Sequence, residues 1–274
     1  MKNYKTEIQN NFWKIKVAAN QIAPSFLRKS YQQLALNELQ IYSSLKEKDI
    51  LIVGIGKGKE IPTLIKKQSN SITGIEPEPI IEPQTFGKKF NLINAPGEKI
   101  PVDSESVDIA YSIATLEHVQ DPKKVVQEMV RVLKPGGIFY CQAGPLWYSF
   151  QGYHKKRRFP ELTEDWLHLI YDKEQLIEKF NLHNSTNYLN QLDKIYESDN
   201  YNRIPAKHYY ETASWLINHH VPLKVNFKLT YEKLNNLKSN YPEKYELISS
   251  KYNHLDLLTN SFTWIFQKDA AALI

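Results

Sequence analysis

Cysteine is almost absent from this 274-residue sequence, which contains one, Cys141. A single cysteine excludes a disulfide framework and suits a reducing compartment such as the cytoplasm. Long apolar runs are also missing: no stretch reaches the roughly 20 apolar residues that a membrane span needs. Residues 1–20 lack the apolar centre typical of a signal peptide. We therefore expect a cytoplasmic protein without a membrane span.

A strong charge imbalance is lacking as well. The 35 basic and 30 acidic residues give a formal net charge of +5. The basic residues are scattered instead of forming a stripe, which argues against nucleic acid as the partner. No Cys/His cluster has metal-ligand spacing, since the pair His219 and His220 stands alone. From the sequence we expect no metal site.

What the chain does contain is an alternation of strand-like and helix-like segments. Periodic apolar stripes predict helices at 27–46 and 121–134, where Asp121 is a good N-cap and Pro122 suits the first helical position. Short apolar runs predict parallel strands at 50–55, 71–77, 90–96, 105–113 and 137–144. This rhythm predicts an α/β protein built on a parallel sheet with right-handed crossovers.

The rhythm changes after residue 144. Aromatic and basic residues crowd "GPLWYSFQGYHKKRRFP", and later only 223–230 and 262–268 resemble strands. We predict that these two C-terminal strands extend the sheet after a helical insertion. The predicted segments are an N-terminal helical lid (1–47), a cofactor-binding core (48–144), a helical insertion that binds the acceptor (145–220) and C-terminal strands that complete the sheet (221–274).

Glycine is scarce, yet Gly54, Gly56 and Gly58 fall within five positions of "DILIVGIGKGKE". A strand that runs into such a loop predicts a cofactor site, and two interpretations compete. The dinucleotide fingerprint G-x-G-x-x-G requires its third glycine where this chain has Lys59. The spacing here is G-x-G-x-G, and it lets the backbone turn sharply and approach a ligand closely.

The glycine loop and three motifs that follow it resemble those of the class I S-adenosylmethionine-dependent methyltransferases of type 11. They are "ILIVGIGKGKE", "ITGIEPEP", "SVDIAYSIATLEHV" and "EMVRVLKPGG", within residues 48–143. The resemblance implies a Rossmann-like, doubly wound sheet and S-adenosylmethionine as the cofactor, with the glycine loop against its methionine half. It also implies cofactor contacts from Glu76 on the ribose (alternatively Glu78 or Glu82), from Gly97 and Glu98 beside the adenine, and from Ser112 at the end of the fourth strand.

Two positions depart from the family pattern. Ile52 stands two residues before the first glycine, where the family usually has an acid, and Pro96 stands where many relatives have an aspartate for the adenine amino group. These departures leave open a catalytically degenerate cofactor-binding protein.

The acceptor side has its own candidates. His118 in "TLEHV" and His154 after the fifth strand are candidate catalytic residues, because a neutral imidazole can take a proton from a hydroxyl acceptor. Candidate acceptor-binding residues follow the fifth strand, namely Trp147, Tyr148, Tyr153, Arg157 and Arg158. The arginines suit an anionic group.

The sequence therefore predicts methyl transfer to an oxygen or nitrogen of a small-molecule or glycan-type acceptor. Two alternatives stay open. One is a nucleic-acid methyltransferase, although "SIATLEH" lacks the tetrapeptide expected after the fourth strand of such enzymes. The other is the degenerate cofactor-binding partner. The oligomeric state is not specified by any pattern in the chain.

Overall fold

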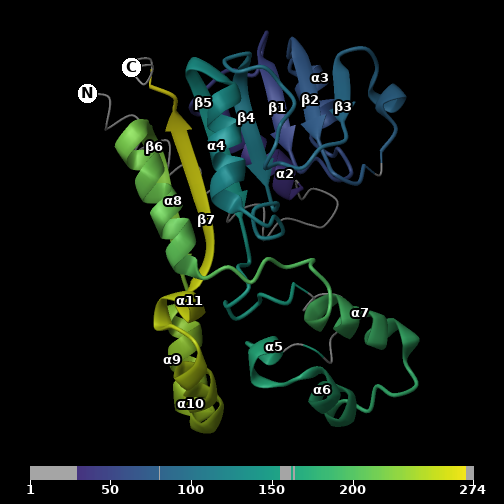
Figure 1. The fold of residues 1–274 in the computed structure, drawn as a ribbon, viewed down its shortest axis with the longest axis vertical. Helices are drawn as coiled ribbons and strands as arrows, with labels where there is room; N and C mark the ends of the chain where they lie inside the picture. The colour runs from purple at the N-terminus through teal and green to yellow at the C-terminus, as the bar shows by residue number, and fades with distance from the viewer. Residues whose placement is uncertain (1–29, 80, 155–161, 163, 270–274) are drawn as a thin grey trace.

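The computed structural model describes residues 30–79, 81–154, 162 and 164–269. These residues form a seven-stranded sheet in the order β3-β2-β1-β4-β5-β7-β6 (Figure 1). Strands β1 to β5 are parallel, while β7 runs antiparallel to β5 and β6. The strands are β1 (Asp49–Val53), β2 (Ser71–Ile75), β3 (Phe90–Ile93), β4 (Val107–Ile113), β5 (Leu133–Ala143), β6 (Val221–Leu229) and β7 (Thr259–Gln267). The predicted fold, a parallel sheet extended by two C-terminal strands, is confirmed.

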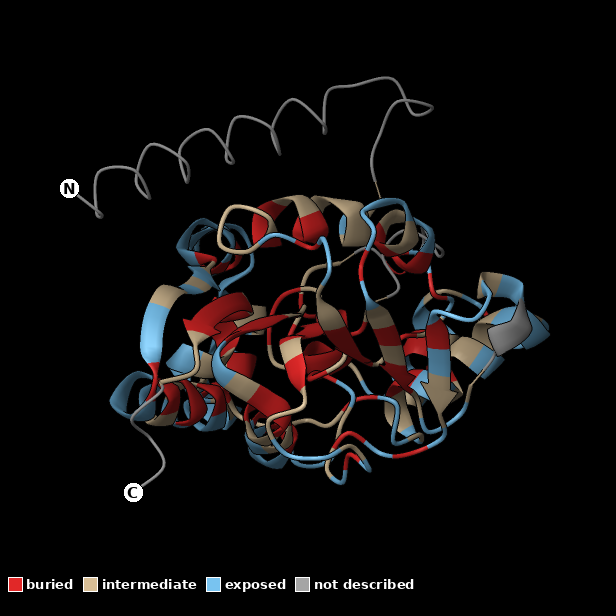
Figure 2. Cartoon of the chain, turned by 90° about the horizontal axis from the view of Figure 1, so that it is seen from above, coloured by how far each residue is buried: buried red, intermediate tan, exposed pale blue. Residues whose placement is uncertain are grey.

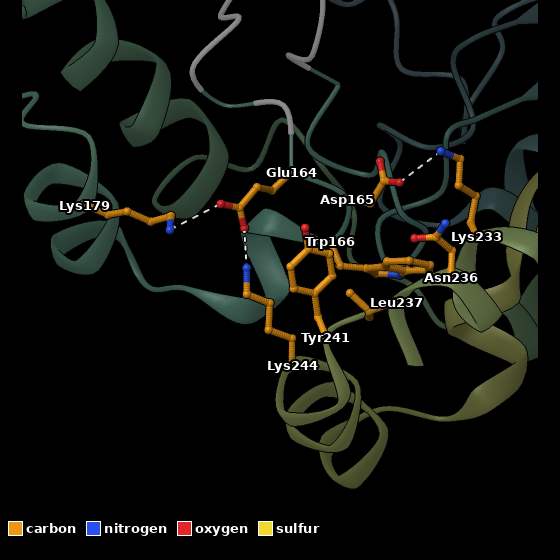
Figure 3. Close-up of a pocket in the computed structure, with 9 residues that line it drawn as sticks. All are labelled: Glu164, Asp165, Trp166, Lys179, Lys233, Asn236, Leu237, Tyr241 and Lys244. Atoms are coloured by element: carbon orange, nitrogen blue, oxygen red, sulfur yellow. Dashed lines mark hydrogen bonds and ion pairs between the residues drawn. The ribbon is translucent and has the colours of Figure 1, made fainter. Parts of the chain in front are cut away.

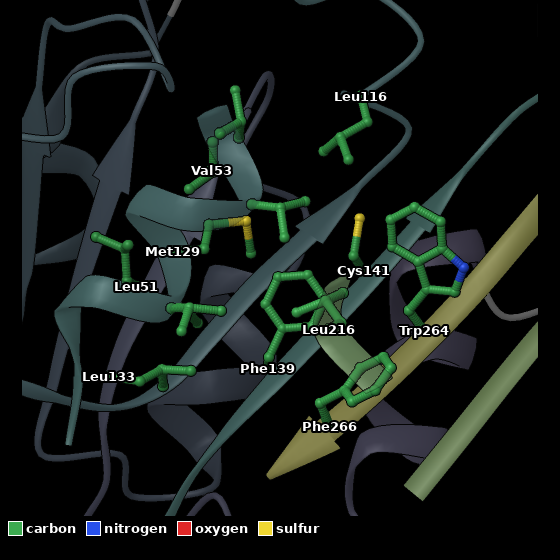
Figure 4. Packing of buried hydrophobic residues seen from close by; sticks show 14 of the residues in the cluster. Leu51, Val53, Leu116, Met129, Leu133, Phe139, Cys141, Leu216, Trp264 and Phe266 are labelled. Carbon is green, nitrogen blue, oxygen red and sulfur yellow. The ribbon is translucent and has the colours of Figure 1, made fainter. Parts of the chain in front are cut away.

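Helices cover both faces of the sheet because its central strands are apolar on both sides. The covering helices are α2 (Tyr31–Leu39), α3 (Ile61–Lys66), α4 (Pro122–Val132) and α8 (Ala206–His219). In β1, Leu51 and Val53 pack into a core with α4 and α8 (Figure 4), whereas Ile50 and Ile52 pack into a second core with α2 and α3. Burial of each such side chain stabilises the fold by roughly 1.5–3 kcal/mol.

Burial follows these layers. Figure 2 shows buried residues along the strands and on the inner sides of the helices, and exposed residues on the outer surface. Across the described part of the chain, we find no helix that is both long enough and apolar enough to cross a membrane.

Helix α4 begins as the sequence predicts. The Asp121 side chain accepts a hydrogen bond of 3.0 Å from a backbone N–H of the first turn, and Pro122 occupies the first position. The helix ends at Val132, earlier than predicted, and β5 begins at Leu133. The predicted stop at "PGG" therefore falls inside β5, because Leu133 already pairs with Val107 of β4.

Helix α2 is shorter than the helix predicted over 27–46. It begins after Ser30, whose hydroxyl accepts a hydrogen bond of 3.2 Å from the N–H of Gln33 in a capping box, and it ends at Leu39. Residues 27–29 lie outside the described residues. The buried face of α2 packs on the sheet, so this part of the predicted N-terminal lid forms one of the layers.

The remaining helices form a helical lobe, which lies below the sheet in Figure 1. One segment supplies α5 (Leu167–Ile170), α6 (Lys173–Lys179) and α7 (Thr186–Tyr196), and the connection from β6 to β7 supplies α9 (Tyr231–Asn240), α10 (Pro242–Lys251) and α11 (His254–Leu258). Trp166, Leu192, Leu234 and Ile248 are fully or nearly fully buried in their shared core. The predicted insertion and the predicted C-terminal segment thus both contribute to the lobe, and their exact boundaries as domains stay a prediction.

Candidate functional site

A cavity of about 620 Å³ lies at the carboxyl ends of the parallel strands. Ligands of open α/β sheets bind at this edge, where the strand order reverses, and here the order reverses between β1 and β4. The volume lies in the usual range for cofactor pockets, roughly 300–1,000 Å³. The lining comes from the end of each strand or the loop after it: Val53 and Gly54 at β1, Ile75, Glu76 and Pro77 at β2, Pro96, Gly97 and Glu98 at β3, and Thr115, His118, Val119, Gln120, Asp121 and Lys124 at β4.

Position 54 has no room for a side chain. Its φ is +76°, and a Cβ at this position would lie 2.0 Å from Thr115 Oγ1. The Thr115 hydroxyl in turn lies 3.3 Å from the carbonyl oxygen of Val53 and 3.1 Å from that of Ile113. Only glycine combines the left-handed conformation with so close an approach, so the glycine loop and the end of β4 are locked together.

Gly56 faces open space instead. Its φ is +50°, and a Cβ there would meet no atom of the described chain within 4 Å. The Gly56 N–H donates a hydrogen bond of 2.9 Å to Glu76 Oε2. This bond ties the loop to the end of β2 and holds the carboxylate in the cavity wall. The third glycine, Gly58, packs against Ile61 of α3.

The predicted adenine side lies after β3. Gly97 packs on β1, since a Cβ there would lie 3.0 Å from Val53 Cγ1. Glu98 Oε1 accepts hydrogen bonds from the backbone N–H groups of Gln120, at 3.0 Å, and Asp121, at 3.3 Å. Glu98 therefore holds the backbone just before α4 in place at the cavity, a role that the sequence did not suggest.

Two positions singled out in the sequence lie inside the sheet. Ser112 is fully buried, and its hydroxyl donates a hydrogen bond of 3.0 Å to the carbonyl oxygen of Val53, so it braces β4 against β1. Ile52 is fully buried toward α2 and α3. A buried carboxyl does occur just after the glycine loop: burial raises the pKa of Glu60 to about 7. The role of Ser112 as a cofactor ligand stays a prediction.

The structure brings the two candidate catalytic histidines together. His118 lines the cavity, and its ring centroid lies 5.3 Å from that of His154. The Nδ1 atom of His118 hydrogen-bonds to the carbonyl oxygen of Asn200, and the Nε2 atom of His154 to that of Pro145, at 2.7 Å. Because a carbonyl oxygen only accepts, each of these ring nitrogens carries the proton.

Glu117 lies beside this pair. The residue is 3% exposed, and its Oε1 accepts a hydrogen bond of 3.1 Å from the N–H of Gly144. Burial raises the pKa of Glu117 to about 8. Sequence reasoning did not select Glu117, nor Thr115 and Lys124 in the cavity wall. For Glu117 and Thr115, their position directly after β4 was the available signal, whereas Lys124 lies in the first turn of α4.

Residues 51–141 match the family model described as a methyltransferase domain. The chain carries a methyltransferase domain. The match begins in β1 and ends in β5, so it includes the glycine loop, Glu76 and all four strand ends that line the cavity. It confirms the class I S-adenosylmethionine-dependent domain, and with it the cofactor, that the motifs predicted.

Curated proteins are similar to part of this chain. An uncharacterized methyltransferase of Mycolicibacterium gilvum (strain PYR-GCK) is 36% identical over 69 residues, which cover 24% of this chain and 27% of that protein. A tRNA U34 carboxymethyltransferase of Saccharophagus degradans is 28% identical over 101 residues, which cover 34% of this chain and 31% of that protein. The chain thus spans about a third or less of the length of these relatives.

The fold extends beyond the methyltransferase domain in solved structures as well. The structure of a geranyl diphosphate methyltransferase in complex with GPP and sinefungin is similar over 88% of this chain and 77% of that chain, with a TM-score of 0.50 and 14% sequence identity. At this identity the likeness shows the fold alone.

Outside the methyltransferase domain, the aromatic candidates for acceptor binding lie in the core of the helical lobe or at its edge. Trp147 is 8% exposed and Tyr153 is fully buried, whereas Tyr148 is half-buried. Arg157 and Arg158 lie outside the described residues. Packing is the role that the structure gives the three aromatic residues, and acceptor binding by any of the five stays a prediction.

A second cavity, of about 470 Å³, lies within the helical lobe (Figure 3). Glu164 pairs with Lys179 at 3.3 Å and with Lys244 at 2.8 Å, and Asp165 pairs with Lys233 at 3.1 Å. The two lysines from α9 and α10 thereby join the two chain segments that build the lobe. We interpret this cavity as part of the scaffold.

Proposed function

We propose that this chain transfers a methyl group from S-adenosylmethionine to an oxygen or nitrogen of a small-molecule or glycan-type acceptor. The observation that carries the proposal is the arrangement at the strand ends. Gly54 of the glycine loop, Glu76 and His118 line one cavity, and the ring of His154 lies beside that of His118.

The residues present fit this cofactor. Gly56 faces open space that a side chain would fill, and its N–H group bonds to the carboxylate that is proposed to accept the ribose hydroxyls. The cofactor supplies an activated methyl on a sulfonium, so the protein need only hold the acceptor in line and exclude water. Orientation of this kind contributes roughly 7–11 kcal/mol.

The acceptor is proposed to enter where the helical lobe contacts the methyltransferase domain. The amide Nδ2 of Asn202 donates to the carbonyl oxygens of Leu116, at 2.6 Å, and Val119, at 2.9 Å. The loop after α7 therefore covers the loop after β4, next to His118. A space closed in this way suits a small acceptor. His118 lines the cavity, and in this proposal it helps to position a hydroxyl acceptor.

The nucleic-acid alternative has one observation in its favour, the 28% identity over 101 residues to a protein named tRNA U34 carboxymethyltransferase. Against it, basic residues of the lobe are paired with acids, as in the contacts of Lys173 with Asp193 and Glu197. We also propose the cytoplasm as the compartment, because the single cysteine, Cys141, is a buried packing residue.

Glu76 provides the first test of the proposed function. Charge-assisted hydrogen bonds contribute roughly 1.5–3 kcal/mol each, so Glu76→Gln should weaken the binding of S-adenosylmethionine by about ten-fold or more. Titration calorimetry measures the change. Glu78 is an exposed carboxylate on the same loop and the alternative ribose ligand. If Glu76 is the ligand, Glu78→Gln should bind the cofactor as the wild type does.

Activity separates the candidate functions. Purified protein with radiolabelled cofactor should label small hydroxyl or amine acceptors and leave tRNA unlabelled. Labelled tRNA alone would favour the nucleic-acid alternative. Cofactor binding without transfer to any acceptor would favour the degenerate partner that Ile52 and Pro96 leave open. An affinity unchanged by Glu76→Gln would remove Glu76 from the cofactor site.

A further inference from the structure

We propose that Glu117, His118 and His154 bind a divalent transition-metal cation beside the cavity that His118 lines. One carboxylate oxygen of Glu117 and one ring nitrogen of each histidine all lie within 4.8 Å of one another. Two imidazoles and a carboxylate are a ligand set that binds zinc, iron or manganese and leaves further coordination positions open. The sequence predicted no metal site here.

The hydrogen bonds of the two rings favour this role. Metal-binding histidines usually donate their second ring N–H to a carbonyl or carboxylate, which fixes the tautomer and orients the ring. Here the Nδ1–H of His118 donates to the carbonyl oxygen of Asn200, and the Nε2–H of His154 donates to that of Pro145. The other nitrogen of each neutral ring then has the lone pair that binds a cation.

Glu117 supplies an independent observation. Its residue is 3% exposed and its Oε1 accepts a hydrogen bond from Gly144. Its Oε2 is buried without a hydrogen-bond partner in the described part of the chain. A buried carboxylate oxygen of this kind is unfavourable unless something binds it, and a cation held by the neighbouring histidines would satisfy it.

The location connects the cation to the proposed function, on which this step rests. His118 also lines the cofactor cavity, so an acceptor hydroxyl on the cation would lie near the cofactor. Binding to the cation makes the hydroxyl more acidic. The hydroxyl would give up its proton to water as it binds the cation, before water is excluded. Its oxygen would then form the O–CH₃ bond, and the S–CH₃ bond of S-adenosylmethionine would break with its electron pair left on sulfur.

The test uses the full chain without a histidine tag, treated with a chelator and then titrated with Co²⁺. We expect one equivalent to bind and to give the visible absorption of cobalt in a nitrogen-containing site. Glu117→Gln and His154→Asn should each weaken cobalt binding at least ten-fold. Asparagine replaces His154 because the φ of His154 is +58°, and asparagine tolerates this conformation. His219→Ala, which removes an exposed histidine outside the cluster, should bind cobalt as the wild type does.

The outcomes are distinct. A spectrum of hydrated cobalt only, or an affinity that neither variant lowers, would overturn the metal site. Circular dichroism identifies a variant that fails to fold, in which case the other variant decides. S-adenosylmethionine binding is measured on the same samples without metal. If the protein binds S-adenosylmethionine but not cobalt, the metal site is refuted and the proposed function stands. If it binds cobalt but not S-adenosylmethionine, the proposed function is refuted and the metal site stands.

Discussion

Gly54 and Gly56 permit a matched test of how the glycine loop works. Both have a positive φ, +76° and +50°, but a Cβ would lie 2.0 Å from Thr115 Oγ1 at Gly54 and would meet nothing within 4 Å at Gly56. A left-handed non-glycine residue costs roughly 1–2 kcal/mol. Gly56→Ala should therefore lower the free energy of unfolding by about that amount.

Gly54→Ala carries the same strain together with the clash. The new methyl must displace the Thr115 side chain from the carbonyl oxygens of Val53 and Ile113, and loss of a hydrogen bond adds roughly 0.5–1.5 kcal/mol. The expected total is about 2–3 kcal/mol or more, measured by urea unfolding. Gly56→Ala should instead show its main effect on cofactor affinity, because its methyl enters the open space.

A double-mutant cycle isolates the clash. Thr115→Ala removes the two closest contacts to a Cβ at Gly54 but leaves the Thr115 Cβ position at 2.8 Å. Adding Thr115→Ala should therefore recover part of the stability that Gly54→Ala loses. It should recover none of the stability that Gly56→Ala loses. Equal losses in both glycine variants, with no coupling to Thr115, would refute the steric explanation.

Two further predictions concern buried groups. Burial raises the pKa of Glu60 from 4.5 to about 7, so its protonated form is favoured in the fold and its contribution to stability is lost as the pH rises from below 4.5 through 7. Glu60→Gln should therefore become more stable relative to the wild type between pH 5 and pH 8, by up to about 3 kcal/mol at 1.36 kcal/mol for each pH unit; a constant difference across urea titrations would contradict this. Tyr153→Phe removes a hydroxyl that donates to the carbonyl oxygen of Leu162 at 2.7 Å, and it should lower the free energy of unfolding by roughly 1 kcal/mol with the acceptor KM unchanged. An altered KM at wild-type stability would instead assign Tyr153 to the acceptor site.

Local patterns in the sequence determined the sheet and the cofactor edge. The apolar run from Ile50 to Val53 has both faces buried, and Asp121 caps the helix that the pattern indicated. Parallel strands joined by helical crossovers all end at one edge of the sheet. The glycine loop and Glu76 therefore had to meet there, which is why residues distant in sequence could be assigned to one cavity.

Only the tertiary structure decided the acceptor side. Tyr153 points into a packed interior, and the helical lobe draws its core from two chain segments on either side of β6. His154, which follows β5, lies next to Glu117 and His118, which follow β4. Periodicity records which face of a single element is apolar, whereas contacts between distant loops depend on how complete elements pack, and no spacing in the sequence encodes them.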